Sequence, residues 1–228
     1  MTLEEAFGDW LRVIDKELLF KVVKDINVLY ANNRCAPEYK DIFKVFKVTP
    51  YKDLRCLWLL QDPYPQQGIA TGVALGNKKD VKELSPSLEV VKDAVINFEI
   101  PHNFITFDPT LEEWSKQGIL LLNTALTVQL NKPGSHSVYW RQFIAKLLQN
   151  ISMDNPGLIY VLWGNSAKSF EHNINKVTAG KIIKMLHPSY YARTNTKIPY
   201  SFFTELTRFI KYHFDYDMEW YKELKFNN

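Results

Sequence analysis

The chain has little cysteine: only Cys35 and Cys56, which are not spaced as a Cys-x-x-Cys pair. This excludes a disulfide framework and favours buried free thiols in a reducing compartment. The histidines lie far apart and form no cluster at metal-ligand spacing. We therefore expect no metal ion and no other cofactor, although a metal site assembled by the fold stays the alternative. The five histidines are His102, His136, His172, His187 and His213.

Long hydrophobic runs and basic tracts are also missing. The chain begins Met-Thr-Leu-Glu-Glu-Ala, with acidic residues where a signal peptide has basic ones, and no membrane-length apolar stretch follows. The sequence therefore predicts an intracellular, cytoplasmic protein that makes no membrane contact. The net charge of +3 is too small to establish a polyanionic partner, but it permits a local basic surface.

The composition is that of a soluble globular protein, with 46% hydrophobic and 23% charged residues. A length of 228 residues allows one sizeable core, and no repeat or flexible linker divides the chain. We expect a single domain over residues 1–228. Its N-terminal part, about 1–52, is predicted to be helical, and Thr2 with Glu5 matches a capping box at its start.

Four short apolar runs are typical of buried strands, and helical patterns separate them. Strands that alternate with helices predict a parallel sheet covered on both faces. The expected fold class is α/β, a three-layer α/β/α sandwich around a four-stranded parallel sheet. One short helix is predicted to be capped by Thr110 and Glu113 and ended by Gly118. The predicted strands are residues 56–60, 119–122, 158–163 and 181–186.

Each predicted strand ends in a polar or small cluster. Any one of these clusters alone could be an ordinary turn. In parallel α/β sheets, however, ligands bind beyond the carboxyl ends of the strands, so all four clusters should meet at one edge. Together they would supply a carboxylate, an amide, an imidazole and several hydroxyl groups. The clusters are Gln61-Asp62, Asn123-Thr124, Gly164-Asn165-Ser166 and His187-Pro188-Ser189.

These clusters resemble the motifs of the uracil-DNA glycosylase family, of the family 1 type. Gln-Asp-Pro-Tyr-Pro at 61–65 stands where that family has Gln-Asp-Pro-Tyr-His, and residues 120–128 read like its Leu-Leu-Leu-Asn-x-x-Leu-Thr-Val segment. Leu-Trp-Gly at 162–164 and His-Pro-Ser at 187–189 match two further motifs. Pro86-Ser87-Leu88 and Ser135-His136 fall in the right order, and several ordered motifs are far more specific than one.

The chain departs from the family pattern at four positions. Pro65 replaces a histidine, although poxvirus members of the family also read Asp-Pro-Tyr-Pro. Leu75 aligns with the phenylalanine that stacks on uracil, so weaker stacking is expected. Tyr191 stands in place of the leucine wedge, and Asn165 in place of the serine of a Gly-Ser pair.

The resemblance implies an enzyme that flips uracil out of DNA and hydrolyses its N-glycosidic bond, releasing free uracil and leaving an abasic site. It implies two catalytic residues: Asp62, which orients or deprotonates the water, and His187, which hydrogen-bonds the uracil O2. The residues implied to bind the base are Gln61, Tyr64, Leu75 and Asn123. Those implied to contact DNA are Pro86, Ser87, Gly164, Asn165, Ser166, Pro188, Ser189 and Tyr191, with Arg193 and Lys197 near the phosphates.

Two other functions stay open at this stage. A weakly active or inactive homologue could serve as a DNA-binding scaffold or replication accessory, which Pro65, Leu75 and Tyr191 would favour. A small-nucleotide-binding α/β enzyme is the second alternative, but the chain has neither G-x-x-x-x-G-K-[ST] nor G-x-G-x-x-G. The leading interpretation is a monomeric enzyme whose partner is uracil-containing DNA.

Overall fold

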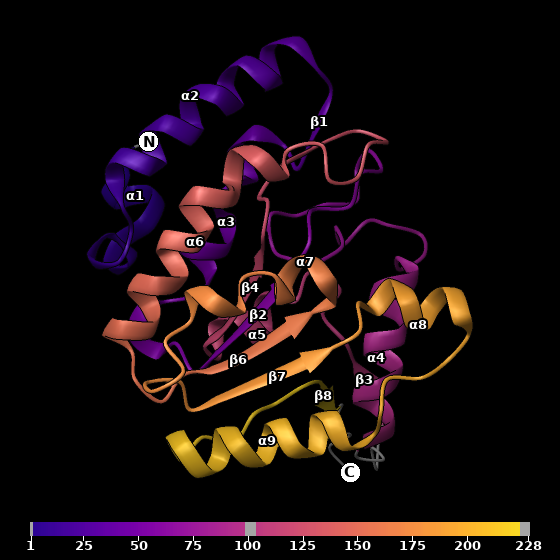
Figure 1. Cartoon of the computed structure of the whole chain (residues 1–228). Coiled ribbons are helices and arrows are strands. Elements are labelled where there is room, and N and C mark those ends of the chain that lie inside the picture. The colour runs from indigo at the N-terminus through magenta and orange to yellow at the C-terminus, as the bar shows by residue number, and fades with distance from the viewer. Residues whose placement is uncertain (1, 99–103, 224–228) are drawn as a thin grey trace.

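A four-stranded parallel sheet lies at the centre of the computed structural model, which describes residues 2–98 and 104–223 (Figure 1). The strands lie in the order β4-β2-β6-β7, and each neighbouring pair is parallel. All four predicted strands are confirmed, to within one residue at each end. They are β2 (Cys56–Leu60), β4 (Ile119–Asn123), β6 (Ile159–Trp163) and β7 (Lys181–Met185).

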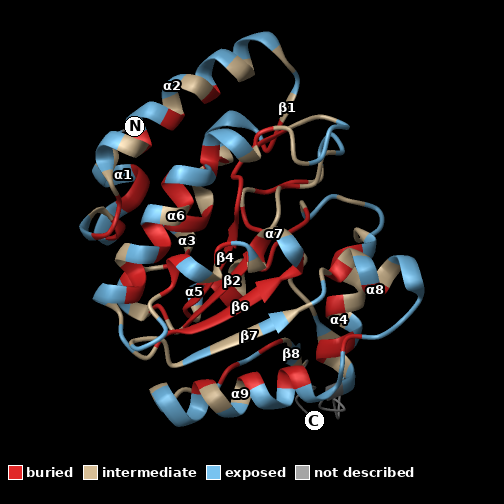
Figure 2. Ribbon diagram, viewed as in Figure 1, coloured by how far each residue is buried: buried red, intermediate tan, exposed pale blue. Residues whose placement is uncertain are grey.

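Helices cover both faces of this sheet, which confirms the three-layer α/β/α sandwich. Successive residues of a strand point to opposite faces, so β2 contributes Leu57 to one core and Trp58 to the other. The first core packs against α2 (Lys16–Asn32) and α6 (Ser137–Asp154), and the second against α4 (Pro86–Phe98) and α9 (Ser201–Phe214). In Figure 2, β6 is buried throughout, whereas β7 at the edge of the sheet is only half-buried.

The N-terminal region is helical but more interrupted than predicted. The capping box of Thr2 and Glu5 is confirmed and begins α1 (Leu3–Phe7). This helix ends at Gly8, whose φ of +50° suits glycine, and the short 3₁₀ helix η1 (Gly8–Arg12) follows before α2. The remaining short helices before the sheet are η2 (Tyr39–Asp41), α3 (Lys44–Val48) and η3 (Tyr51–Asp53).

Two pairs of two-residue strands were not predicted. Strand β1 (Cys35–Ala36) pairs with β5 (Val128–Gln129), and β3 (Ile105–Thr106) pairs with β8 (Lys222–Glu223). Two residues are too few to show an alternating pattern. None of the described helices is long and apolar enough to cross a membrane.

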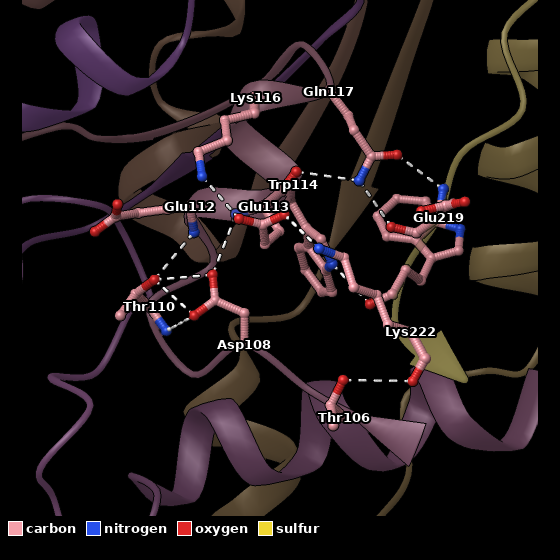
Figure 3. Close-up of polar contacts among 11 residues, drawn as sticks. Thr106, Asp108, Thr110, Glu112, Glu113, Trp114, Lys116, Gln117, Glu219 and Lys222 are labelled. Carbon is pink, nitrogen blue, oxygen red and sulfur yellow. Dashed lines mark hydrogen bonds and ion pairs between the residues drawn. The ribbon is translucent and has the colours of Figure 1, made fainter. Parts of the chain in front are cut away.

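The predicted cap of helix α5 (Glu112–Lys116) is wrong. Asp108, not Thr110, accepts a hydrogen bond from the Glu113 N–H (3.1 Å), while the Thr110 hydroxyl accepts one from the Glu112 N–H (3.3 Å; Figure 3). The Asp108 carboxylate also accepts from the Thr110 N–H and hydroxyl, because a charged acceptor with two oxygens serves several donors at once. The predicted end of the helix is confirmed, since Gly118 follows it at a φ of +85°.

Candidate active site

The polar clusters at the strand ends meet at one edge of the sheet, as the sequence predicts. Asp62 follows β2, Asn123 ends the neighbouring β4, and His187 follows β7. All three side chains line one enclosed cavity of about 20 Å³, which has space for about one water molecule. Asp62 and His187 also line an outer, open cavity of about 790 Å³. A flipped base would therefore have to widen the enclosed part.

Asp62 is a half-buried carboxylate at the entrance to the enclosed cavity. Burial raises its pKa above the ordinary value, and hydrogen bonds from the Gly134 N–H and the Gln61 side chain oppose this rise. A carboxylate with a raised pKa is a stronger proton acceptor than an exposed aspartate. Asp62 is therefore suited to orient and deprotonate a water molecule.

His187 caps the first turn of α8 (Pro188–Thr194). Its Nδ1 accepts a hydrogen bond from the Ser189 N–H (3.1 Å), and burial, with the charge of Arg193, lowers its pKa to about 4. The imidazole is therefore neutral at pH 7. Because a ring nitrogen that accepts an N–H carries no proton, the single proton must be on Nε2, where it can be donated to a ligand.

A glycine allows His187 to sit close to β6. Gly164 has a φ of +79°, and a Cβ at this position would lie 2.9 Å from the Cβ of His187. Such a contact is too short for carbon atoms, so any larger residue would displace the histidine or the chain around it. The close approach of His187 thus explains why the Leu-Trp-Gly motif of this chain ends in glycine.

Asn123 is held at the cavity by backbone pairing between β4 and β2. The residue beyond it, Thr124, donates its N–H to the Leu60 carbonyl (2.9 Å) and its hydroxyl to the Gln61 carbonyl (2.7 Å). Asn123 is 7% exposed, and no hydrogen bond joins its amide to another residue in the described part of the chain. A buried amide that lines a cavity offers one donor face and one acceptor face to a ligand.

Tyr64 and Leu75 form the apolar side of the enclosed cavity. The Tyr64 hydroxyl donates to the Leu75 carbonyl (3.2 Å), and burial raises the pKa of Tyr64 to about 12. Leu75 has a φ of +65°, a backbone conformation that costs a leucine about 1–3 kcal/mol and persists only when its surroundings impose it. The strained residue lies at the cavity, where such strain is commonly found.

The segments predicted to contact DNA line the outer cavity, but they are not loops. Pro86 and Ser87 begin α4, Gly164 to Ser166 begin α7 (Gly164–Lys168), and Ser189 lies in the first turn of α8. Pro188, at the start of α8, is buried. Their proline and glycine residues suggested turns, whereas proline is also common in the first turn of a helix. The exposed Arg193 lines this cavity as well.

The placement of Tyr191 disagrees with its predicted role as a wedge. Tyr191 is only 7% exposed and packs in the core beneath α4, whereas its neighbour Tyr190 is 43% exposed. Because this segment is the helix α8, successive side chains point in directions about 100° apart. The helix turns Tyr191 inward, and Tyr190 becomes the exposed aromatic residue.

The sequence reasoning missed three residues that support the site. Gly134 donates its N–H to Asp62, and the side chains of Asn77 and Ser85 hydrogen-bond each other beside Tyr64. Ser135 and His136 were recognised in the family order, which pointed to the segment of Gly134 but not to its contact. No pattern marked Asn77 or Ser85.

No group of three or more His, Cys, Asp and Glu side chains that could hold a metal ion occurs within residues 2–98 and 104–223. His102, one of the five histidines considered above, lies outside the described residues. His136 is buried, and its Nδ1 lies 2.9 Å from the Thr127 hydroxyl.

Comparisons with known proteins identify the family of this chain. The model of the Uracil DNA glycosylase superfamily matches residues 46–211. The uracil-DNA glycosylase of Fusobacterium nucleatum is 32% identical over 225 residues, which cover 96% of this chain and 97% of that protein. The enzyme of the same name from Campylobacter jejuni is 35% identical over 196 residues, covering 82% of this chain and 81% of its own length.

Two solved structures show the same fold. The crystal structure of mimivirus uracil-DNA glycosylase has a TM-score of 0.72 at 22% identity and covers 96% of this chain and 93% of its own. The UNG protein from Nitratifractor salsuginis has a TM-score of 0.55 at 19% identity, with coverage of 84% and 85%. The superfamily model covers most of the chain, and the bacterial relatives align with it over most of its length. The chain therefore belongs to the uracil-DNA glycosylase superfamily.

Proposed function

We propose that this pocket hydrolyses the N-glycosidic bond of uracil in DNA, releasing free uracil and leaving an abasic site. The observation that carries the proposal is that Asp62, Asn123 and His187 line one cavity in a member of this family. An enzyme that acts on a base in a duplex must flip that base out of the stack. The open cavity leads from the surface to the enclosed one, which has to widen to admit the base.

The reaction develops positive charge on the sugar and negative charge on the departing base, and catalysis stabilises both. The Asp62 carboxylate lies where it can direct a water molecule at the sugar and stabilise the oxocarbenium-like transition state. The neutral His187 donates its Nε2 proton in a hydrogen bond to the uracil O2 as the negative charge grows. No covalent step by the protein is needed.

Selection of the base follows from the remaining side chains of the cavity. The Asn123 amide matches the donor and acceptor edge of uracil, whereas cytosine presents the opposite pattern at N3 and N4. The Tyr64 ring blocks the space that a thymine methyl group would need. Leu75 offers an apolar floor without a π face, so stacking on the base is weaker than on a phenylalanine. Gln61 supports the site through its carbonyl and its contact with Asp62.

Contacts with DNA come from the first turns of α4, α7 and α8, whose hydroxyl and backbone N–H groups suit close approach to phosphates. We assign the wedge that fills the gap left by the flipped base to the exposed Tyr190 in place of Tyr191. The family 1 type, the monomeric state, the intracellular location and the single domain over residues 1–228 stay predictions from the sequence.

The protein is expected to release uracil without any added metal. Purified protein should leave alkali-labile sites in a uracil-containing oligonucleotide in the presence of EDTA, because the proposed roles need only protein side chains. An oligonucleotide with thymine at the same position is the control. An absence of cleavage at high protein concentration would contradict the proposal and favour a DNA-binding scaffold.

Replacing Tyr64 by alanine should allow slow excision of thymine and reduce excision of uracil. The change removes the ring that blocks the methyl group and also removes packing from the cavity. Matched oligonucleotides with uracil or thymine at one position measure the ratio of the two rates. If the ratio in Tyr64→Ala equals that of the wild type, another residue excludes thymine.

Replacing Asn123 by aspartate should allow slow excision of cytosine. The aspartate side chain has the same shape as asparagine. When it is protonated, either oxygen can carry the proton, so the donor and the acceptor can exchange places. Rates on cytosine and uracil oligonucleotides provide the test, and cytosine excision should increase as the pH falls. Cytosine excision no faster than that of the wild type at any pH would show that Asn123 does not read the base.

A further inference from the structure

Asn77 lies behind the base pocket and is completely buried. Its Oδ1 accepts a hydrogen bond from the Ser85 N–H (2.6 Å). Its Nδ2 donates to the Leu75 carbonyl (3.3 Å) and to the Ser85 hydroxyl (3.2 Å). One amide therefore joins two segments that are separated by several residues in the chain.

The chemistry of its partners fixes the orientation of this amide. A backbone N–H can only donate, so Oδ1 must face Ser85, and a carbonyl can only accept, so Nδ2 must face Leu75. The Asn77 N–H in turn donates to the Pro109 carbonyl (2.7 Å). The preceding Gly76 permits this close packing, since a Cβ there would lie 2.5 Å from the Thr110 carbonyl oxygen.

The same cluster holds the wall and the floor of the pocket. The Leu75 carbonyl accepts hydrogen bonds from both Asn77 and the Tyr64 hydroxyl. The side chains of Ser85 and Asn77 also lie close to that hydroxyl, where they oppose the rise in the pKa of Tyr64 that burial causes. Leu75 needs such support, because its φ of +65° is unfavourable for a leucine.

On its other side the cluster reaches the proposed DNA-contacting surface. The Ser85 carbonyl accepts the N–H groups of Leu88 (2.9 Å) and Glu89 (3.0 Å) at the start of α4. Ser85 also lines the outer cavity beside Pro86 and Ser87. A shift of Asn77 would therefore move the pocket and the start of α4 together.

We propose that Asn77 is a positioning residue that sets the separation of Tyr64 from Leu75 and ties both to residues 85–87. Selectivity for uracil then depends on a buried amide that touches neither the base nor the DNA. This inference rests on the proposed function. Release of uracil by the wild type tests that function alone, and the variants below test Asn77.

The main test is Asn77→Asp. The aspartate has the shape of asparagine and can still accept the hydrogen bond from the Ser85 N–H, but it places an oxygen where the Nδ2 donor to the Leu75 carbonyl was. We expect kcat/KM on uracil oligonucleotides to fall roughly 10- to 100-fold, because small displacements of a pocket have effects of this size. The preference for uracil over thymine should also fall. The control is Ser152→Ala near the far end of α6, which removes a buried hydroxyl and the hydrogen bond that it accepts from the Asn175 N–H (3.1 Å). It should lower Tm and leave base preference unchanged.

Two further variants distinguish positioning from a loss of stability. Ser85→Ala keeps the hydrogen bond from the backbone N–H to Asn77 but removes the hydroxyl. It should lower the preference for uracil over thymine by less than Asn77→Asp does. Tyr64→Phe keeps the ring, and its effect combined with Asn77→Asp should be less than additive, because both act through the Leu75 carbonyl. If Asn77→Asp does not fold, the base preference of Ser85→Ala tests the positioning role instead. An unchanged base preference in the folded variants, or additive effects, would overturn the proposal.

Discussion

Replacing Asp62 by asparagine is expected to lower the turnover of uracil in DNA by roughly 10²- to 10⁴-fold, the range for one lost general base. The amide keeps the shape and can still accept the Gly134 hydrogen bond. It cannot take a proton from water or balance positive charge on the sugar. Affinity for DNA should change much less, because phosphate contacts supply most of it. Single-turnover rates and binding to an uncleavable oligonucleotide separate the two effects.

The pH dependence gives a second test of Asp62. Because burial raises the pKa of this carboxyl, wild-type activity should decline on acidification at a higher pH than an exposed aspartate would cause. Asp62→Asn should lack this decline. A folded-state pKa above the unfolded value means that the ionised carboxylate destabilises the fold as the pH rises through that range. The variant should therefore be at least as stable as the wild type at pH 7.

The control for Asp62 is Asp25→Asn, which removes the same charge from α2, away from the cavity. It should leave the rate and its pH dependence unchanged. A wild-type rate in Asp62→Asn, or an equal loss in Asp25→Asn, would show that Asp62 is not the residue that directs the water.

The sheet could be predicted because buried parallel strands are continuous apolar runs. Residues 119–123 illustrate this, since Ile-Leu-Leu-Leu is buried throughout and ends in Asn123. Topology then places the strand ends together, so Asp62, Asn123 and His187 could be expected at one cavity. Pairs such as Cys35–Ala36 with Val128–Gln129 carry no such pattern, because their pairing depends on the tertiary path of the chain.

What the sequence did not reveal depends on features that neighbouring residues in sequence do not determine. Tyr190 and Tyr191 are identical in type, and only the phase of α8 decides which one is buried. The contact between Gly134 and Asp62 joins residues 72 positions apart and depends on the path of the loop before α6. Asn77 has no apolar periodicity to mark it, and its role follows only from its partners in the fold.

Replacing His187 by leucine should lower turnover by roughly 10²- to 10³-fold, the effect of losing one hydrogen-bond donor to a developing oxyanion. The leucine fills similar space but offers no proton to the uracil O2. The matched control is His172→Leu, because His172 is exposed in the short 3₁₀ helix η4 (Glu171–Asn173). Gly164→Ala provides an independent test, since its Cβ would displace His187 without removing it. A full rate in His187→Leu would contradict the assigned role.

Stability should reveal the neutral state of His187 independently of catalysis. Burial lowers its pKa in the folded protein from 6.5 to about 4, so between these values the unfolded chain binds the proton more readily. The contribution of the neutral imidazole to the free energy of unfolding is therefore complete above pH 6.5, and it is lost as the pH falls toward 4. His187→Leu has no imidazole to protonate and lacks this loss. The Tm of the wild type minus the Tm of the variant should therefore decrease as the pH falls from 6.5 to 4. A difference that is constant with pH would mean that the imidazole is not held neutral, and its proposed Nε2 donor would lose its support.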